Sequence, residues 1–127
     1  FKAFCIANYD ANGDGELSLS EAEAVLDMDC SSLFIEDLTG IQAFVNLKSL
    51  NCSFNRLTSL GDLTQLTKLE ILHCKNNRLS DLGDLTILAK LEVLDFSFSA
   101  TNSWIIGSLC SERHSKARAL SKFDFRF

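Results

Sequence analysis

The feature that most constrains the fold of this chain is an internal repeat with a spacing of 22 residues. Apolar side chains recur at this spacing in several columns, three of which are Val25, Leu47, Leu69 and Leu91; Met28, Leu50, Leu72 and Leu94; and Cys30, Cys52, Cys74 and Phe96. Self-similarity at a fixed short period is the signature of a stacked-repeat protein. One repeat of this size cannot bury its own apolar side chains, so neighbouring repeats must stack to build a continuous core.

The two middle copies of the repeat read LKSLNCSFNRLTSLGDL and LEILHCKNNRLSDLGDL. Their pattern, L-x-x-L-x-C-x-x-N-x-L, resembles the leucine-rich-repeat family over roughly residues 25–112, and it looks most like bacterial internalin-type repeats. The resemblance implies an α/β repeat solenoid. Such a horseshoe fragment has short parallel strands on its concave face and turns or 3₁₀ segments on its convex face.

The spacing also predicts how the chain is divided. We expect a cap over residues 1–24 and leucine-rich repeats over residues 25–127, with copies at 25–46, 47–68, 69–90 and 91–119 and a partial copy at 120–127. The fourth copy is longer because Leu120 follows Leu91 by 29 residues, which predicts a partly helical convex excursion from Ser103 to Ala119. Since the last copy stops in mid-repeat, we expect the chain to be a piece of a longer protein.

Within each repeat, the predicted strand places successive side chains on opposite sides of the sheet. In the second copy, Leu50 and Cys52 are expected to face the core, and Ser49, Asn51 and Ser53 are expected to face solvent.

An asparagine follows the predicted strand in the two middle copies, at Asn55 and Asn77. An amide side chain at this turn can satisfy buried backbone groups of an adjacent coil. Leu33 and Ser99 stand at this position in the first and fourth copies. The sequence therefore predicts an asparagine ladder that weakens at both ends.

The cysteine column admits two interpretations. The thiols of Cys30, Cys52 and Cys74 can pack in the core as small apolar groups. Alternatively they can form disulfides or a metal site, because neighbouring parallel strands lie only about 5 Å apart. The chain has five cysteines, so they cannot all pair within it, and it contains no Cys-x-x-Cys motif. These observations favour the core interpretation.

Residues 10–21 read DANGDGELSLSE, which matches the EF-hand calcium loop D-x-N-x-D-G-x₅-E. Ca²⁺ takes six to eight oxygen ligands, and this spacing supplies them from alternate loop positions. The ligands expected from the motif are Asp10, Asn12, Asp14, the backbone carbonyl of Glu16, Ser18 and Glu21. We therefore predict a single EF-hand-like or dockerin-like calcium loop between two short helices, forming an N-terminal helical cap.

A second interpretation of the same residues is a turn that leads into a helix. Ser18-x-x-Glu21 is also a capping-box pattern, and Asn-Gly and Asp-Gly pairs mark turns. A helix cap alone does not require oxygen-bearing side chains at three alternate positions, which favours calcium binding. Calcium loops of this kind before leucine-rich repeats resemble those of secreted or surface proteins of anaerobic gut bacteria.

The solvent-facing strand positions are the candidate partner-binding surface. The predicted contact residues on the concave face are Asn51, Phe54, Ile71, His73, Asp95 and Phe98. Exposed apolar side chains rimmed by polar groups often mark interaction sites. The alternative is that Phe54 and Phe98 fold down against the turn of the next coil.

Several function classes have no support in the sequence. No apolar run approaches the length of a membrane span. The basic residues of 113–127 come without a nucleic-acid recognition motif, and no nucleophile motif, phosphate loop or paired catalytic carboxylate is present. We therefore expect a non-catalytic module that binds a protein or a glycan, secreted or at the cell surface, with structural calcium.

Two alternatives to this hypothesis remain open. The first is a cytoplasmic regulatory scaffold that docks a partner enzyme on the same face, because free thiols are typical of reducing compartments. The second is a calcium-responsive switch, which a single loop fused to a rigid solenoid does not favour.

Overall fold

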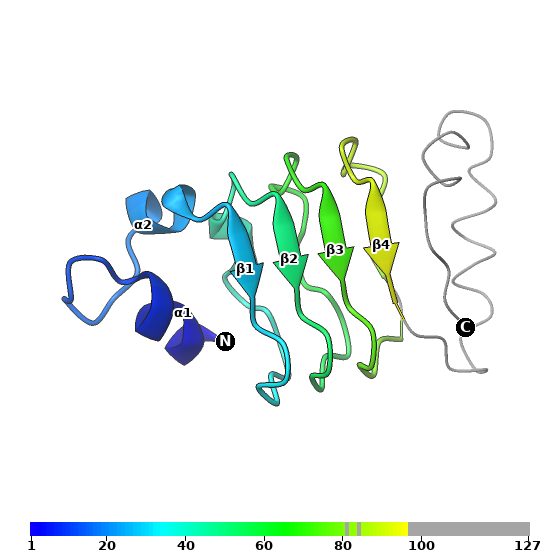
Figure 1. Cartoon of the computed structure of the whole chain (residues 1–127), viewed down its shortest axis with the longest axis horizontal. Coiled ribbons are helices and arrows are strands. Elements are labelled where there is room, and N and C mark those ends of the chain that lie inside the picture. Colours follow the sequence, from blue (N-terminus) through cyan, green and yellow to red (C-terminus); the bar gives the residue numbers. More distant parts are fainter. Residues whose placement is uncertain (81, 84, 97–127) are drawn as a thin grey trace.

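The structure, a computed structural model, describes residues 1–80, 82–83 and 85–96. Its centre is one parallel sheet with the order β1-β2-β3-β4, formed by β1 (Asp27–Asp29), β2 (Ser49–Asn51), β3 (Ile71–His73) and β4 (Val93–Asp95) (Figure 1). The strands pair in the predicted register, since Met28 lies opposite Leu50, Leu50 opposite Leu72, and Leu72 opposite Leu94. The 22-residue columns are therefore confirmed as a stack of coils.

The apolar columns of these coils fill the space behind the sheet. Strand residues Leu50, Leu72 and Leu94 are fully buried, and so is Leu66 on the returning segment. The first coil returns through a short 3₁₀ helix, η1 (Ile41–Ala43), which places Ile41 and Phe44 in the same core. One cluster of buried side chains thus runs through successive coils, as expected for a solenoid.

The cysteine column lies inside this core. Cys30 and Cys52 are 0% exposed, Cys74 is 1% exposed, and all three are free thiols. Burial raises the pKa of Cys30 and of Cys74 to about 12, because a thiolate would lose its hydration there. The thiols are therefore neutral apolar groups, which confirms the core interpretation for these three residues.

Two short helices close the N-terminal end of the core. They are α1 (Lys2–Tyr9) and α2 (Leu19–Ala24), which lie beside β1 (Figure 1). Cys5 of α1 and Ala22 of α2 are buried against the first coil. Two rings also pack on Phe44 of the first coil, with centroids 6.2 Å away for Phe1, which precedes α1, and 6.1 Å away for Tyr9 at its end. Aromatic pairs at such distances stabilise a contact beyond the area that they bury.

The predicted asparagine ladder is present. The Oδ1 atom of Asn55 accepts hydrogen bonds from the amides of Leu33 and Ile35 in the preceding coil, both at 3.0 Å. Its Nδ2 atom donates to the carbonyl oxygens of Cys30 at 2.8 Å and Cys52 at 3.0 Å. Each asparagine thereby joins two coils through backbone groups that burial would otherwise leave without partners.

Asn77 repeats this arrangement one coil later. It accepts from the amide of Leu57 and donates to the carbonyl oxygens of Cys52 and Cys74. The recurrence shows that the turn after each strand has the same geometry in the second and third coils.

One expectation about the strands is wrong. Ser53 was expected on the solvent side, but it is only 2% exposed. The strict alternation of side chains holds only inside a strand, and β2 ends at Asn51. Beyond that residue the chain turns inward, so that Cys52 and Ser53 are both buried.

Several sequence-based expectations are not tested by the described residues. The excursion from Ser103 to Ala119 and the partial copy at 120–127 lie outside them. The division into residues 1–24 and 25–127 stays a prediction. In the part of the chain that the structure describes, no helix has the length and apolarity needed to cross a membrane.

The asparagine ladder generates a test of coil stacking. Replacing Asn55 by Ala leaves two amides and two carbonyl groups without their buried partner, so we expect the free energy of unfolding to fall by about 2–4 kcal/mol. Urea denaturation followed by circular dichroism measures this change. The exposed Gln42→Ala is the control and should change stability little. Equal effects of the two substitutions would contradict the role of the ladder.

Candidate functional site

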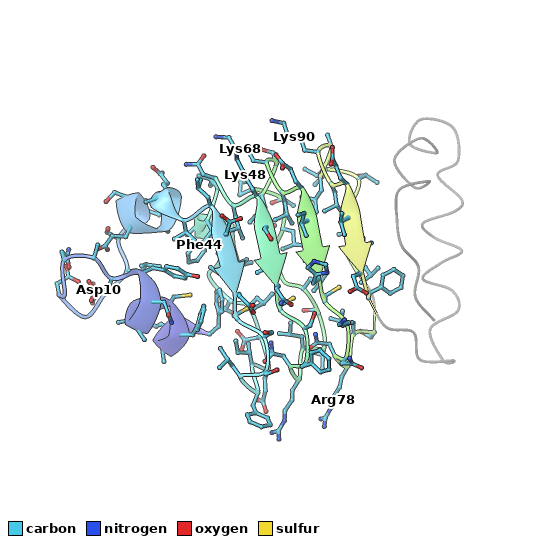
Figure 2. All side chains as sticks on the ribbon, in the orientation of Figure 1. Asp10, Phe44, Lys48, Lys68, Arg78 and Lys90 are labelled. Carbon is cyan, nitrogen blue, oxygen red and sulfur yellow. The ribbon has the colours of Figure 1, made fainter. Side chains whose placement is uncertain are left out.

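The loop between α1 and α2 folds around its own acidic and amide side chains, and Asp10 begins it (Figure 2). The two carboxylate oxygens of Asp10 accept hydrogen bonds from the amides of Gly13 at 2.7 Å and Gly15 at 2.8 Å. Gly13 and Gly15 have positive φ angles of 74° and 85°, a conformation that glycine adopts without a steric penalty. The glycines therefore let the backbone bend back toward the first side chain of the motif.

The next two motif positions continue the same pattern. Asn12 Oδ1 accepts from the amide of Asp14 at 2.8 Å, and Asp14 Oδ1 accepts from the amide of Glu16 at 2.9 Å. The side-chain Nδ2 of Asn12 also donates to Asp14 Oδ2 at 2.9 Å. Side-chain oxygens from alternate positions are thus turned toward the loop backbone rather than spread over the surface.

Glu21 connects the two ends of the loop. Its Oε1 atom accepts from the amides of Ala11 at 2.9 Å and Asn12 at 3.2 Å. Its Oε2 atom accepts from the amide and the hydroxyl of Ser18, at 2.8 Å and 2.7 Å. The hydrogen bonds from Ser18, with those from the loop amides, lower the pKa of Glu21 to about 2. The carboxylate is therefore ionised at any physiological pH.

The helix-capping interpretation is confirmed. Ser18 is the N-cap of α2, and its hydroxyl accepts from the amide of Glu21 in a full capping box. A capping box accounts for the contacts between Ser18 and Glu21. It does not account for the hydrogen bonds that Glu21 accepts from Ala11 and Asn12 at the opposite end of the loop.

The described residues contain no group of three His, Cys, Asp or Glu side chains that is arranged to hold a metal ion. The carboxylates of Asp10, Asp14 and Glu21 point instead to amides of the loop. The chemistry of the ligands nevertheless suits a hard cation, because every side chain that the motif supplies carries an oxygen atom. Among the described residues, the Glu16 carbonyl oxygen accepts no hydrogen bond, which leaves it free to serve as a ligand.

The outward face of the sheet carries a polar row, consisting of Asp29, Asn51, His73 and Asp95, whose members lie opposite one another in register. His73 Nδ1 lies 3.4 Å from Asp95 Oδ2, and Lys75 Nζ lies 3.7 Å from the same oxygen. Hydrogen bonds from the hydroxyl and amide of Ser31 lower the pKa of Asp29. The structure therefore brings three of the predicted contact residues, Asn51, His73 and Asp95, into one line across the strands.

The apolar members of the predicted surface lie in different surroundings. Ile71 and Val93 are half-buried, as are Asn51, His73 and Asp95 of the polar row beside them. Phe54 is 52% exposed, and Lys75 Nζ of the next coil lies 5.8 Å from the centroid of its ring. Phe54 follows the end of β2 by three residues, so it lies at the end of the sheet rather than on its face. Phe98 lies outside the described residues.

Comparisons with known proteins agree with this fold. Residues 45–86 match a family model described as leucine-rich repeats in two copies. The described coils therefore have a leucine-rich-repeat fold, and residues 45–86 match the repeat sequence itself. Its structure is also similar to the functional domain of InlJ from Listeria monocytogenes, which is described as including a cysteine ladder. No curated protein sequence matches the chain.

The similarity to InlJ covers 70% of this chain but only 21% of that protein's chain. The sequence identity is 27% and the TM-score is 0.56. The chain thus spans about a fifth of the InlJ chain. Its own Cys30, Cys52 and Cys74 are buried at equivalent positions of successive coils.

Sequence reasoning missed a second set of exposed side chains. Phe34 is 71% exposed and Leu33 is 47% exposed. The guanidinium carbon of Arg56 lies 4.9 Å from the centroid of the Phe34 ring. The signal that could have found this contact is the repeat itself, because Phe34, Arg56 and Arg78 are spaced by 22 residues.

The depressed pKa of Glu21 generates a pH prediction for the calcium-free protein. The unfolded state takes up the Glu21 proton near the ordinary pKa of 4.5, whereas the native state takes it up only near pH 2. The stabilisation from this group is therefore complete above about pH 4.5 and is lost as the pH falls toward 2. Denaturant titrations with a chelator should show that the stability difference between the natural chain and Glu21→Gln shrinks over this range. Glu23→Gln is the control, and a difference that does not depend on pH would contradict the assignment.

Proposed function

We propose that this chain is a non-catalytic binding module that contacts a protein or glycan with the outward face of its sheet. The supporting observation is the polar row of Asp29, Asn51, His73 and Asp95, which places carboxylate, amide and imidazole groups side by side on adjacent strands. Such mixed donors and acceptors can recognise either a peptide or the hydroxyl groups of a sugar. A repeat fold by itself does not determine function, so the proposal depends on these side chains.

We also propose that Asp10, Asn12, Asp14, Glu16, Ser18 and Glu21 bind one Ca²⁺. The support comes from Glu21, whose ionised carboxylate spans both ends of the loop. Bound calcium would supply positive charge among the three carboxylates of Asp10, Asp14 and Glu21, and it would thereby remove their mutual repulsion. Because α1 and α2 pack on the first coil, this stabilisation would reach the N-terminal end of the solenoid.

The proposed location is outside the cell, in a secreted or surface-attached protein. Calcium is abundant there, and a structural calcium site would remain occupied. A second candidate is a cytoplasmic scaffold that docks a partner enzyme, and the free thiols of Cys5, Cys30, Cys52 and Cys74 favour it. Burial raises the pKa of these thiols, and a neutral buried thiol reacts slowly, so they can also persist in an oxidising environment.

Calcium binding is tested by titration calorimetry of the metal-free chain. We expect one site and a melting temperature that rises with calcium, since a ligand in hundredfold excess over Kd adds about 2.7 kcal/mol of stability. Glu21→Gln retains a capping side chain but loses the charged ligand, so it should abolish the calcium heat. Glu23→Gln, two residues further along α2, should bind calcium normally. If neither calcium nor a chelator changed the melting temperature of the natural chain, calcium binding would be contradicted. The loop would then be only a turn and a helix cap.

The outward face is tested by surface plasmon resonance on the immobilised full chain, probed with a glycan array and with purified extracellular proteins. We expect saturable binding to a defined ligand and a loss of about tenfold in affinity for Asn51→Ala/His73→Ala, because both side chains lie in the polar row. Lys48→Ala, at the amino-terminal end of β2, is the control. A ligand that binds all three chains equally would contradict the assignment of the face.

A further inference from the structure

Three large apolar side chains are exposed at the end of the sheet at which the strands terminate. Phe34 is 71% exposed, Phe54 is 52% exposed and Leu33 is 47% exposed. All three residues follow a strand, since β1 ends at Asp29 and β2 ends at Asn51. Single exposed apolar residues are common on soluble proteins, whereas a group of them points to a contact surface.

Both phenylalanines are held in a strained backbone conformation. Phe34 has a φ of 56° and Phe54 a φ of 58°, in the left-handed region that disfavours residues with a bulky side chain. At the position equivalent to Phe54, the third coil has Asn76 with a φ of 54°. Asparagine tolerates this conformation far better than phenylalanine. A phenylalanine at this position therefore destabilises the turn, and its half-exposed ring gains little from packing in return.

Cations lie over both rings. The Arg56 guanidinium carbon is 4.9 Å from the Phe34 centroid, and Lys75 Nζ is 5.8 Å from the Phe54 centroid. Arg78 follows Arg56 by one coil and is exposed like it. Within the described residues, neither guanidinium pairs with a carboxylate, whereas Lys75 lies 3.7 Å from Asp95. Among the described residues, no carboxylate therefore competes with an external anion for the two arginines.

The position of this charge is specific to one end of the sheet. Figure 2 shows Arg78 at this end and Lys48, Lys68 and Lys90 at the opposite end. Lys68 donates a 2.6 Å hydrogen bond to Asn46 there. The acidic Glu36 follows Phe34 by two residues in the first coil, so the positive charge belongs to the second and third coils.

We propose that this carboxyl-end edge docks an acidic polypeptide segment that carries apolar side chains. The edge consists of Leu33, Phe34, Phe54, Arg56, Lys75 and Arg78. Carboxylates of the partner would pair with the guanidinium groups of Arg56 and Arg78, which suit bidentate contacts. Its apolar side chains would cover the rings of Phe34 and Phe54. The inference rests on the proposed binding function and names the chemistry of one partner.

The spacing of the arginines favours a helical partner. Arg56 and Arg78 are in equivalent positions of adjacent coils, and adjacent strands lie about 4.8 Å apart. Carboxylates on a helix at positions i and i+4 have Cβ atoms about 5–6 Å apart. Alternate residues of an extended peptide are about 6.8 Å apart, which fits the arginines less well. A helix also presents apolar side chains beside such a carboxylate pair, where they can reach the two rings.

The test is a selection of displayed random 16-residue peptides on the natural full chain, followed by fluorescence anisotropy with the synthetic winners. Selected peptides should carry paired Asp or Glu residues beside Leu, Ile or Phe. Their affinity should fall by about tenfold or more for Arg56→Gln/Arg78→Gln. The matched control is Lys48→Gln/Lys90→Gln, which removes the same charge from the opposite end of the sheet and should bind normally.

The other outcomes separate this proposal from the proposed function. Peptides whose binding depends on His73 but not on the arginines would overturn the edge and leave the outward face as the binding surface. Winners that are not acidic would also overturn it. Heparin serves as a polyanionic glycan probe. The proposal would also be overturned if heparin bound through Arg56 and Arg78 while acidic peptides did not bind. If neither peptides nor glycans bind the chain at all, both proposals fail.

A second variant keeps binding separate from folding. Phe54→Asn places in the second coil the residue that the third coil has at Asn76, so it relieves the backbone strain. We expect its melting temperature to rise by about 2–6 °C while its affinity for the selected peptides falls at least about fivefold. A fall in both quantities would show that the ring holds the coil together, and it would overturn a binding role for Phe54.

Discussion

The structure depends on the pairing of three-residue strands in register between coils. Each coil contributes a single strand to the sheet, so a leucine such as Leu50 has no packing partner on a neighbouring strand of its own repeat. It must be covered by Met28 on one side and Leu72 on the other. Each strand is too short to be stable alone. Its stability comes from burying one apolar column against the next, and a slip of one residue would turn every leucine of that strand toward solvent.

The dependence on pairing between coils leaves groups without partners at two places, the turn after each strand and the ends of the stack. The chain must bend sharply after each strand, which buries amides and carbonyl groups that no strand can pair. Asn55 and Asn77 solve this problem by reaching back to the coil before them, so the ladder transmits order from coil to coil. At the N-terminal end, where no further coil exists among the described residues, the rings of Phe1 and of Tyr9 in α1 pack on Phe44 instead. The acidic loop is therefore attached to α1, which packs on Phe44 in the core of the first coil.

Stacking also decides which side chains are available for function. The first three coils share one backbone conformation at the turn after the strand, which places Ser32, Phe54 and Asn76 in the same left-handed region. The path does not depend on which residue stands there, because the core on either side imposes it. Side chains that face the core are consequently mostly apolar, with Ser53 and Asn55 as buried polar residues, while positions on the outward face and on the carboxyl-end edge can vary. Binding chemistry is found in these variable positions, as with Asp95 beside His73 or Arg56 over Phe34.

The sequence by itself determined the repeat, its register and the interior. Leucines at a fixed spacing have one arrangement that buries them all, and Asn55 and Asn77 could be assigned to the turn because few side chains can satisfy both amides and carbonyl groups. It also indicated the loop motif, although the pattern could not show that Glu21 reaches Ala11 and Asn12. Only the tertiary structure decided that Ser53 is buried and that Phe34 and Phe54 are exposed. The physical reason is that the alternation of sides ends where the strand ends. Beyond it, the direction of a side chain follows from the φ and ψ angles of the turn, and those are set by the coils packed on either side.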